Sequence, residues 1–251
     1  MALDPNTMSF VSPPIDQEII KRFGDPRLLI PIYSKASMTR YPFLLKYNLI
    51  PFRIGIGKAV LTRAKLFIDL PESASEPPIL LTFDKKTLPV SLQSKIETEA
   101  KYLALGFEAT VIRQGLDIQP ESRISLGLFG KMNLDFAKVS LVDEQGTDHL
   151  LELSNVQFDL DFSVETESDV FLIEAKLGRP KTFSALQLFY PLTLMKNVDI
   201  DHSKRLQTVL VSISNNGSRI SYTFYKYFFK SQTVANSCTF LSSKTVNLSL
   251  E

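Results

Sequence analysis

The stretch Val156-Gln157-Phe158-Asp159-Leu160-Asp161-Phe162 alternates apolar and polar residues, and the apolar run Phe171-Leu172-Ile173-Glu174-Ala175-Lys176 follows it closely. Period-2 alternation predicts a half-buried β-strand, and a short continuous apolar run is typical of a buried strand. Because side chains alternate faces along a strand, Glu174 and Lys176 project from one face, and the two aspartates share a face of the preceding strand. The two stretches therefore predict strands that bring carboxylates and one lysine together.

Further helices and strands are predicted around these two stretches. Apolar spacing predicts helices over Ser91–Leu105, which Gly106 would end, and over Thr182–Met195. The Asn216-Gly217 pair within Ser214–Ser218 predicts a hairpin between the strands on either side. Strands are expected over Phe107–Ile112, Ser125–Val142, Val156–Phe162, Val170–Ala175, Leu206–Ile213, Arg219–Phe229 and Thr239–Leu250. This order predicts an α/β fold in which a mixed β-sheet is flanked by helices.

The N-terminal third is predicted to form a separate subdomain. Residues 71–78, Pro-Glu-Ser-Ala-Ser-Glu-Pro-Pro, are the best linker candidate in the chain. They divide a β-containing segment, residues 1–78, from a larger domain, residues 79–251. A short helix over Ile15–Phe23 and strands over Phe52–Gly57 and Ala59–Ile68 are expected in the smaller part.

Composition narrows the class of protein. The 251 residues are 44% hydrophobic and 22% charged, which is typical of a globular protein with a sizeable core. No apolar run approaches the length of a membrane span, and the N-terminus has no secretory signal, so a cytoplasmic protein without a membrane partner is expected. One cysteine and two histidines disfavour disulfides and structural zinc.

Charge is unevenly distributed although the net charge is only +1. Residues 1–65 hold ten Lys or Arg against four Asp or Glu, residues 66–170 hold eight against nineteen, and residues 171–251 again hold ten against four. Phosphate binding depends on local basic surface rather than on total charge. Two basic flanks around an acidic centre are compatible with a nucleic-acid partner, although segment charges also scatter in this way by chance.

The acids and the lysine suit metal-dependent phosphodiester hydrolysis. Asp159 and Glu174, with the Ala175 carbonyl as a further ligand, offer the hard oxygens that Mg²⁺ prefers. A bound Mg²⁺ activates water and neutralises phosphoryl charge. Lys176, with its pKa lowered beside a cation, would position or deprotonate that water. Asp161 is the alternative first acid or a second-metal ligand. The competing interpretation is a salt bridge between Glu174 and Lys176 beside solvated aspartates.

These residues resemble the PD-(D/E)xK nuclease superfamily, in particular type II restriction endonucleases. The resemblance covers roughly residues 91–230 and is specific mainly at Phe158–Lys176 and at Gln187-Leu188-Phe189-Tyr190-Pro191. No Pro precedes Asp159, which departs from the family pattern. The resemblance implies a restriction-endonuclease-like core, with Gln187, and more weakly Tyr190, near the scissile phosphate. It also implies a metal-binding helix acid, with Glu97 preferred over Glu99. The simpler interpretations are a surface amide for Gln187 and a core aromatic for Tyr190.

The expected function is therefore a Mg²⁺-dependent endodeoxyribonuclease that cuts double-stranded DNA, in particular a type II site-specific restriction enzyme. Such enzymes usually act as homodimers because two-fold protein symmetry matches a symmetric site. A repair or junction-resolving nuclease with the same core, and a non-catalytic DNA-binding module, remain as alternatives. The basic residues expected to contact DNA are Arg53, Arg63, Lys65, Arg179 and Lys181.

Overall fold

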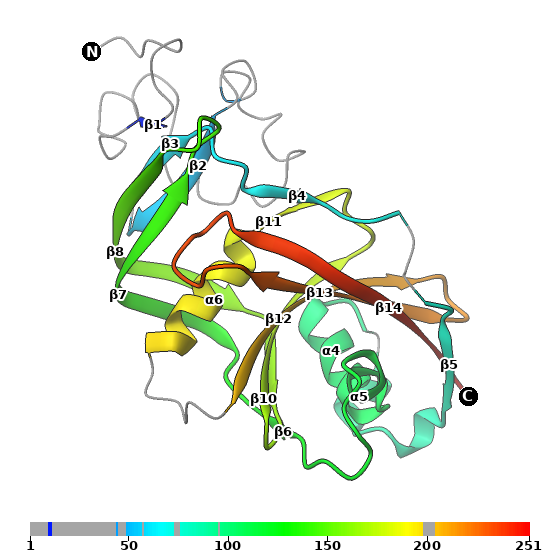
Figure 1. Ribbon diagram of the computed structural model, residues 1–251. Coiled ribbons are helices and arrows are strands. Elements are labelled where there is room, and N and C mark those ends of the chain that lie inside the picture. The colour runs from blue at the N-terminus through cyan, green and yellow to red at the C-terminus, as the bar shows by residue number, and fades with distance from the viewer. Residues whose placement is uncertain are drawn as a thin grey trace.

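A large mixed β-sheet forms the centre of the molecule (Figure 1). The computed structural model describes residues 10–11, 44, 49–56, 58–72, 76–94, 96–197 and 204–251, so the helix predicted over Ile15–Phe23 lies outside the described residues. β10 runs parallel to β12 and β14 runs parallel to β5, whereas the other neighbours are antiparallel. The strand order is β5 (Ile79–Phe83), β14 (Cys238–Leu250), β13 (Ile220–Phe229), β12 (Arg205–Asn215), β10 (Asp169–Leu177), β9 (Phe162–Glu165) and β6 (Ser125–Leu126).

A second sheet has five strands, in the order β1 (Phe10–Val11), β3 (Lys58–Thr62), β2 (Ile50–Gly55), β8 (Asp148–Leu160) and β7 (Gly130–Val142). A two-stranded sheet pairs β11 (Thr182–Ser184) with β4 (Phe67–Asp69). Only Asp161 separates β8 from β9, so the chain passes from the five-stranded to the seven-stranded sheet at this residue. Because β2 and β3 share a sheet with β7 and β8, the described part of residues 1–78 contributes to a common core, and its independence stays a prediction.

Helices cover both faces of the seven-stranded sheet (Figure 1). The helices α4 (Glu99–Glu108) and α5 (Val111–Gly115) pack on one face, against β10, β13 and β14. On the other face α6 (Leu186–Asn197) contacts β10 and β12, and also β7 and β8 of the smaller sheet. Because α6 lies between two sheets, most of its residues are buried, as expected for a helix that is apolar on all sides. The short elements η3 (Lys85–Thr87) and α3 (Val90–Gln93) precede α4.

The strand β10 is apolar on both faces because both faces are covered, as is common for a central strand with a parallel neighbour. Phe171, Ile173 and Ala175 belong to the core beneath α4 and α5. Val170 and Leu172 belong to the core around α6. Alternation along the strand therefore turns Glu174 towards α6, in a layer that is mainly hydrophobic.

The predicted mixed sheet with flanking helices is confirmed, and so is the hairpin, which the antiparallel pair β12 and β13 forms. The strand predicted over Phe107–Ile112 is wrong, because this segment forms the end of α4 and the start of α5. The single helix predicted over Ser91–Leu105 is also wrong. It is divided into α3 and α4, and Thr98 caps the second part by accepting a 3.3 Å hydrogen bond from the Lys101 amide.

Two further boundaries differ from the predictions. Gly106 does not end a helix but lies buried inside α4. The helix predicted over Thr182–Met195 begins as the strand β11, because the backbone of Thr182–Ser184 pairs with β4, and becomes helical only at Leu186.

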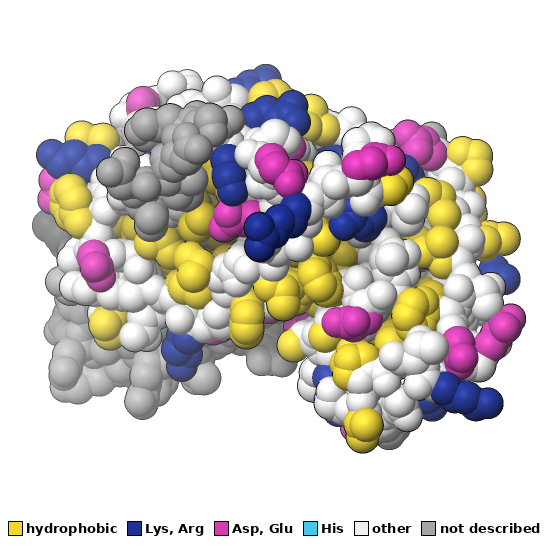
Figure 2. Space-filling model, turned by 90° about the horizontal axis from the view of Figure 1, so that it is seen from below, with side chains coloured by type: hydrophobic (Ala, Val, Ile, Leu, Met, Phe, Trp, Pro, Cys, Tyr) yellow, Lys and Arg dark blue, Asp and Glu magenta, His cyan; other side chains and the backbone are white. Residues whose placement is uncertain are grey.

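The surface view in Figure 2 shows basic and acidic side chains interspersed with exposed hydrophobic ones on one face of the molecule. Within the part of the chain that the structure describes, the helices are all too short or too polar to cross a membrane.

Candidate functional site

The carboxyl end of β10 carries a buried acid and a lysine that face α6. The Glu174 side chain is 7% exposed and the Lys176 side chain is 25% exposed. The Lys176 ammonium lies 2.5 Å from Glu174 Oε1 and donates a 2.8 Å hydrogen bond to the Ala175 carbonyl. Glu174 and Lys176 therefore meet on one face of the strand, as their spacing predicts, and they form an ion pair.

Asp161 reaches the same strand end from the junction between β8 and β9. Its Oδ2 accepts a 2.8 Å hydrogen bond from the backbone amide of Ala175, the residue between Glu174 and Lys176. The preferred sequence candidate, Asp159, is exposed on β8, where it lies opposite Lys131 of β7. Both aspartates line one cavity with Glu174 and Lys176. The contact with β10, however, favours Asp161 over Asp159 as the first acid.

The first residue of α4, Glu99, supplies another carboxylate at this strand end. Its Oε1 accepts a 3.1 Å hydrogen bond from the backbone amide of Leu177, directly after Lys176. Glu97, the preferred candidate from the sequence, is exposed before the helix and lines a neighbouring cavity with Tyr102 and Gly178. The structure thus brings Glu99, and not Glu97, into the cavity with the other acids.

Gln187 joins the site from the first turn of α6. Its Nε2 donates a short hydrogen bond to Glu174 Oε1, the same oxygen that Lys176 contacts. Its Oε1 is buried and has no hydrogen-bond partner among the described residues. Since a buried acceptor without a partner costs free energy, this oxygen is available to a ligand or a water that enters the site.

These groups surround a cavity of about 220 Å³ between α6 and the ends of the strands. One wall holds the polar groups described above. The other wall is largely apolar, and of its residues the sequence analysis placed only Tyr190 near the site. Its residues come from β2, β3, β8 and α6, and no local sequence signal predicts that these segments meet. The apolar wall consists of Pro51, Ala59, Phe158, Leu186 and Tyr190.

The charges of the cluster favour the binding of positive species. Burial raises the pKa of Glu174 to about 8, and the nearby charges of Asp161 and Glu99 add to that rise while Lys176 opposes it. Burial works against the charged form of Lys176, but the Glu174 carboxylate outweighs it and raises the lysine pKa. In the absence of a cation, the pKa of Lys176 is thus raised, opposite to the lowering expected beside a metal ion.

The donor set fits a hard divalent cation, although it is not arranged as a metal centre. Among the described residues, no group of three or more His, Cys, Asp or Glu side chains is gathered closely enough to hold a metal ion as the side chains lie. Instead, the Lys176 ammonium lies between the oxygens of Glu174 and Ala175. Carboxylate, carbonyl and amide oxygens are the ligands that Mg²⁺ prefers. The unpartnered Oε1 of Gln187 is a further buried oxygen at this place.

Of the basic residues expected to contact DNA, only Arg53 lines the cavity. Its Nη1 donates a 2.6 Å hydrogen bond to the Gln157 carbonyl. The hydroxyl of Tyr190 donates a 2.8 Å hydrogen bond to the Arg53 carbonyl, across 137 positions in the sequence.

The other basic candidates lie outside the cavity. Lys65 is exposed and lines a separate cavity beside Cys238. Arg179 donates a 3.0 Å hydrogen bond to the Pro71 carbonyl, and Lys181 is exposed in the same loop. Arg63 is half-buried on the segment that follows β3. Whether any of them contacts DNA stays a prediction.

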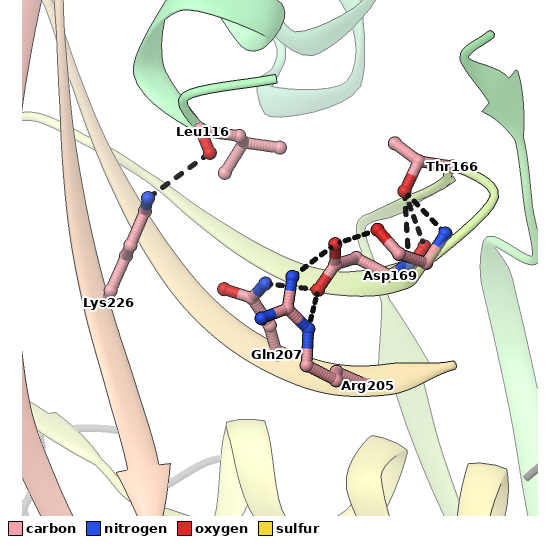
Figure 3. A network of polar contacts seen from close by, with 7 residues as sticks. Leu116, Thr166, Asp169, Arg205, Gln207 and Lys226 are labelled. Carbon is pink, nitrogen blue, oxygen red and sulfur yellow. Dashed lines mark hydrogen bonds and ion pairs between the residues drawn. The ribbon is translucent and has the colours of Figure 1, made fainter. Parts of the chain in front are cut away.

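A second buried carboxylate lies at the opposite end of β10 (Figure 3). The carboxylate of Asp169 accepts hydrogen bonds from Arg205 at 2.9 Å, from Gln207 at 2.6 Å and from the hydroxyl of Ser168 at 2.6 Å. Burial opposes ionisation of Asp169, but these hydrogen bonds outweigh it and lower its pKa. This network is well satisfied and joins β10 to β12.

Comparison with known proteins gives a family without an assigned activity. The family described as Domain of unknown function (DUF6997) matches residues 62–246, most of the chain. The chain belongs to this family. Neither a curated protein nor a solved structure matches the chain. The matched region contains every acid of the cavity, together with Lys176 and Gln187.

Proposed function

We propose that this protein is a Mg²⁺-dependent endodeoxyribonuclease with a PD-(D/E)xK, restriction-endonuclease-like core. The observation that carries the proposal is the 2.8 Å hydrogen bond from the Ala175 amide to Asp161. It ties the acid at the junction of β8 and β9 to the Glu-x-Lys segment of β10, an arrangement of the kind that the resemblance implies. The mixed sheet with helices on both faces supports the same proposal.

In this proposal Asp161, Glu174 and the Ala175 carbonyl hold Mg²⁺, and Glu99 is the helix acid beside them. When bound, Mg²⁺ supplies an activated water and neutralises charge on the phosphoryl oxygens. Binding of the ion requires the Lys176 ammonium to leave the Glu174 carboxylate. Gln187 keeps its hydrogen bond to Glu174 and so holds that carboxylate in place.

Lys176 has a positioning or proton-transfer role in the proposal. In the absence of Mg²⁺ the Glu174 carboxylate raises the pKa of Lys176, and binding of the ion would end that contact. Lys176 would then donate hydrogen bonds to the attacking water or to a phosphate oxygen, or accept a proton from that water.

The proposed substrate is double-stranded DNA, and the proposed class is a type II site-specific restriction enzyme that acts as a homodimer. A repair or junction-resolving nuclease would use the same residues. The alternative without catalysis is a DNA-binding module, and the ion pair between Glu174 and Lys176 favours it, because that ion pair blocks the carboxylate.

Incubation of unmethylated phage DNA with the full chain, in Mg²⁺ and in EDTA, tests the proposal. Discrete fragments that appear only with Mg²⁺ are expected from the wild type, and none from Glu174→Gln. As a matched control, Glu152→Gln changes an exposed acid that pairs with Lys138 on the β7–β8 hairpin, outside the cavity, and should cut normally. Equal cutting by Glu174→Gln, or no Mg²⁺-dependent cutting by the wild type, would refute the proposal.

A further inference from the structure

The apolar wall of the cavity presents an aromatic surface next to the acids. Phe158 is partly buried and lines the cavity. Its ring stacks on Tyr190, with centroids 6.1 Å apart and planes inclined by 28°. Tyr190 is fixed in turn by an edge contact with Phe52 and by its hydrogen bond to Arg53. Phe158 is therefore a supported platform and not a freely moving surface ring.

The size of the cavity limits what it can hold. Its volume of about 220 Å³ is below the range of roughly 300–1,000 Å³ found for pockets that bury a whole drug-sized ligand. The space suits one planar ring system with a little water, and is too small for two stacked bases.

Polar groups at the edge of the apolar wall suit a heteroaromatic ring. Gln157 lines the cavity beside Arg53, and its backbone carbonyl accepts a hydrogen bond from the Arg53 guanidinium. Arg53 uses two of its N–H groups on the carbonyls of Gln157 and Gly55, which fix the guanidinium within the cavity wall. The remaining N–H groups of a guanidinium are donors of the kind that read acceptors on the edges of nucleobases.

We infer that the cavity receives a single nucleobase, unstacked from its strand, beside the phosphodiester that the protein cuts. This inference rests on the proposed function and defines its substrate more narrowly. The base stacks on Phe158, its edge meets Arg53, and its 5′ or 3′ phosphate lies at Asp161, Glu174 and Lys176. The protein therefore acts on a nucleotide that is extruded from the duplex or already unpaired.

The inference predicts a preference among DNA substrates. Removing a base from the stack costs free energy, and the cost is smallest for a mismatched, bulged or single-stranded base. The test compares a fully paired oligonucleotide duplex with the same duplex carrying one bulged nucleotide, both with Mg²⁺. Cleavage next to the bulge should be at least about tenfold faster than cleavage of the paired duplex.

Variants of Phe158 test whether the base stacks on this ring. Phe158→Leu keeps an apolar side chain but removes the stack, and should raise KM for the bulged duplex roughly 5- to 150-fold, the range for loss of one base–aromatic stack. Phe158→Tyr keeps an aromatic ring and should keep the faster cleavage of the bulged duplex. Phe136→Leu is the matched control, because Phe136 is 53% exposed on β7 and does not line the cavity. Thermal melting of each variant checks that the fold is retained.

Two outcomes separate failure of this inference from failure of the proposed function. Equal cleavage of paired and bulged duplexes, unchanged by Phe158→Leu, would overturn the nucleobase pocket and leave the nuclease intact. If no substrate is cut, the nuclease fails, and the pocket is then tested by binding alone. A bulged duplex carrying 2-aminopurine should lose fluorescence through stacking on wild-type protein in Mg²⁺, since no cleavage then competes with binding. If the fluorescence falls equally with Phe158→Leu and with the wild type, the pocket is refuted.

Discussion

The two ends of β10 shift the pKa of a buried carboxylate in opposite directions. At the first residue, Asp169 accepts hydrogen bonds from Arg205, Gln207 and Ser168, and its pKa is lowered (Figure 3). Five positions later Glu174 is similarly buried, is contacted by Lys176 and Gln187, and has a pKa raised to about 8. One strand thus carries one carboxylate whose charge is stabilised and one whose charge is not.

The difference separates a structural acid from an acid that is suited to chemistry. A carboxylate that is ionised and fully hydrogen-bonded gains little from a cation. A carboxylate that is buried with neighbouring acids gains much more, because a cation removes their mutual repulsion. Strongly perturbed pKa values in a cleft are typical of functional sites. The comparison therefore points to the Glu174 end of β10 as the place where ligand binding changes the energy of the molecule.

The largest expected effect concerns Lys176. Lys176→Met should lower the Mg²⁺-dependent cleavage rate roughly 10²- to 10³-fold, the range for loss of one preorganised electrostatic contact to the reacting groups. The melting temperature should change little, because Glu174, with its raised pKa, can take up a proton. The matched change at the other end, Arg205→Met, should leave the cleavage rate unchanged. If Lys176→Met leaves the cleavage rate unchanged, the Glu174 end of β10 is no more important for cleavage than the Asp169 end.

A second expected effect distinguishes the two aspartates near the cavity. Asp161→Asn should lower the cleavage rate at least about tenfold, because the amide loses the charge needed to hold a metal ligand set together. Asp159→Asn should change the rate less than about threefold. Both variants conserve shape, so initial rates at saturating Mg²⁺ compare them directly. The reverse ranking would return the role of first acid to Asp159.

The raised pKa of Glu174 predicts how the need for Mg²⁺ depends on pH. Below pH 8 a proton competes with the cation for this carboxylate. The Mg²⁺ concentration for half-maximal cleavage should therefore rise about tenfold for each pH unit below 8 and level off above it. Mg²⁺ titrations between pH 6 and pH 9 measure this slope. A half-maximal concentration that is independent of pH would show that Glu174 is already ionised without the cation.

The smallest expected effect is one of stability at the Asp169 end. Asp169→Ala should lower the free energy of unfolding by about 1–3 kcal/mol, because it leaves Gln207 and Ser168 without their acceptor. The lowered pKa of Asp169 fixes the sign of the pH dependence: its contribution is present above the ordinary value of 3.8 and is lost as the pH falls further. Denaturant unfolding at pH 7 and pH 3 measures the loss of unfolding free energy and its pH dependence. Asp148→Ala, which changes an exposed residue, is the control.

The sequence predicts much of the sheet, because its signals there are local. Alternation in β8, the apolar run of β10 and the Asn216-Gly217 turn each depend on a few neighbouring residues. The meeting of Glu174 and Lys176 follows from strand parity alone. These features are correct in the structure because the period of a strand leaves few alternatives.

The incorrect predictions arise where tertiary pairing overrides a local pattern. The alternation from Val156 to Phe162 looks like one strand, yet the chain changes sheet at Asp161, and only this change turns Asp161 towards β10. Similarly, the apolar residues of Phe107–Ile112 suggest a strand. The backbone instead turns at Thr110, which has a φ of 60°, and continues as α5. A pattern of hydrophobic residues gives no information on such a turn.

The position of Asp161 between two sheets gives the protein a mechanical link. β8 belongs to the sheet that also contains Arg53, whereas β9 is paired with the strand that carries Glu174. A rotation of one sheet against the other would change the separation of Asp161 from Glu174, and α6, which contacts both sheets, would take part in it. If the smaller sheet binds DNA, as proposed, DNA binding would act directly on the geometry of these carboxylates.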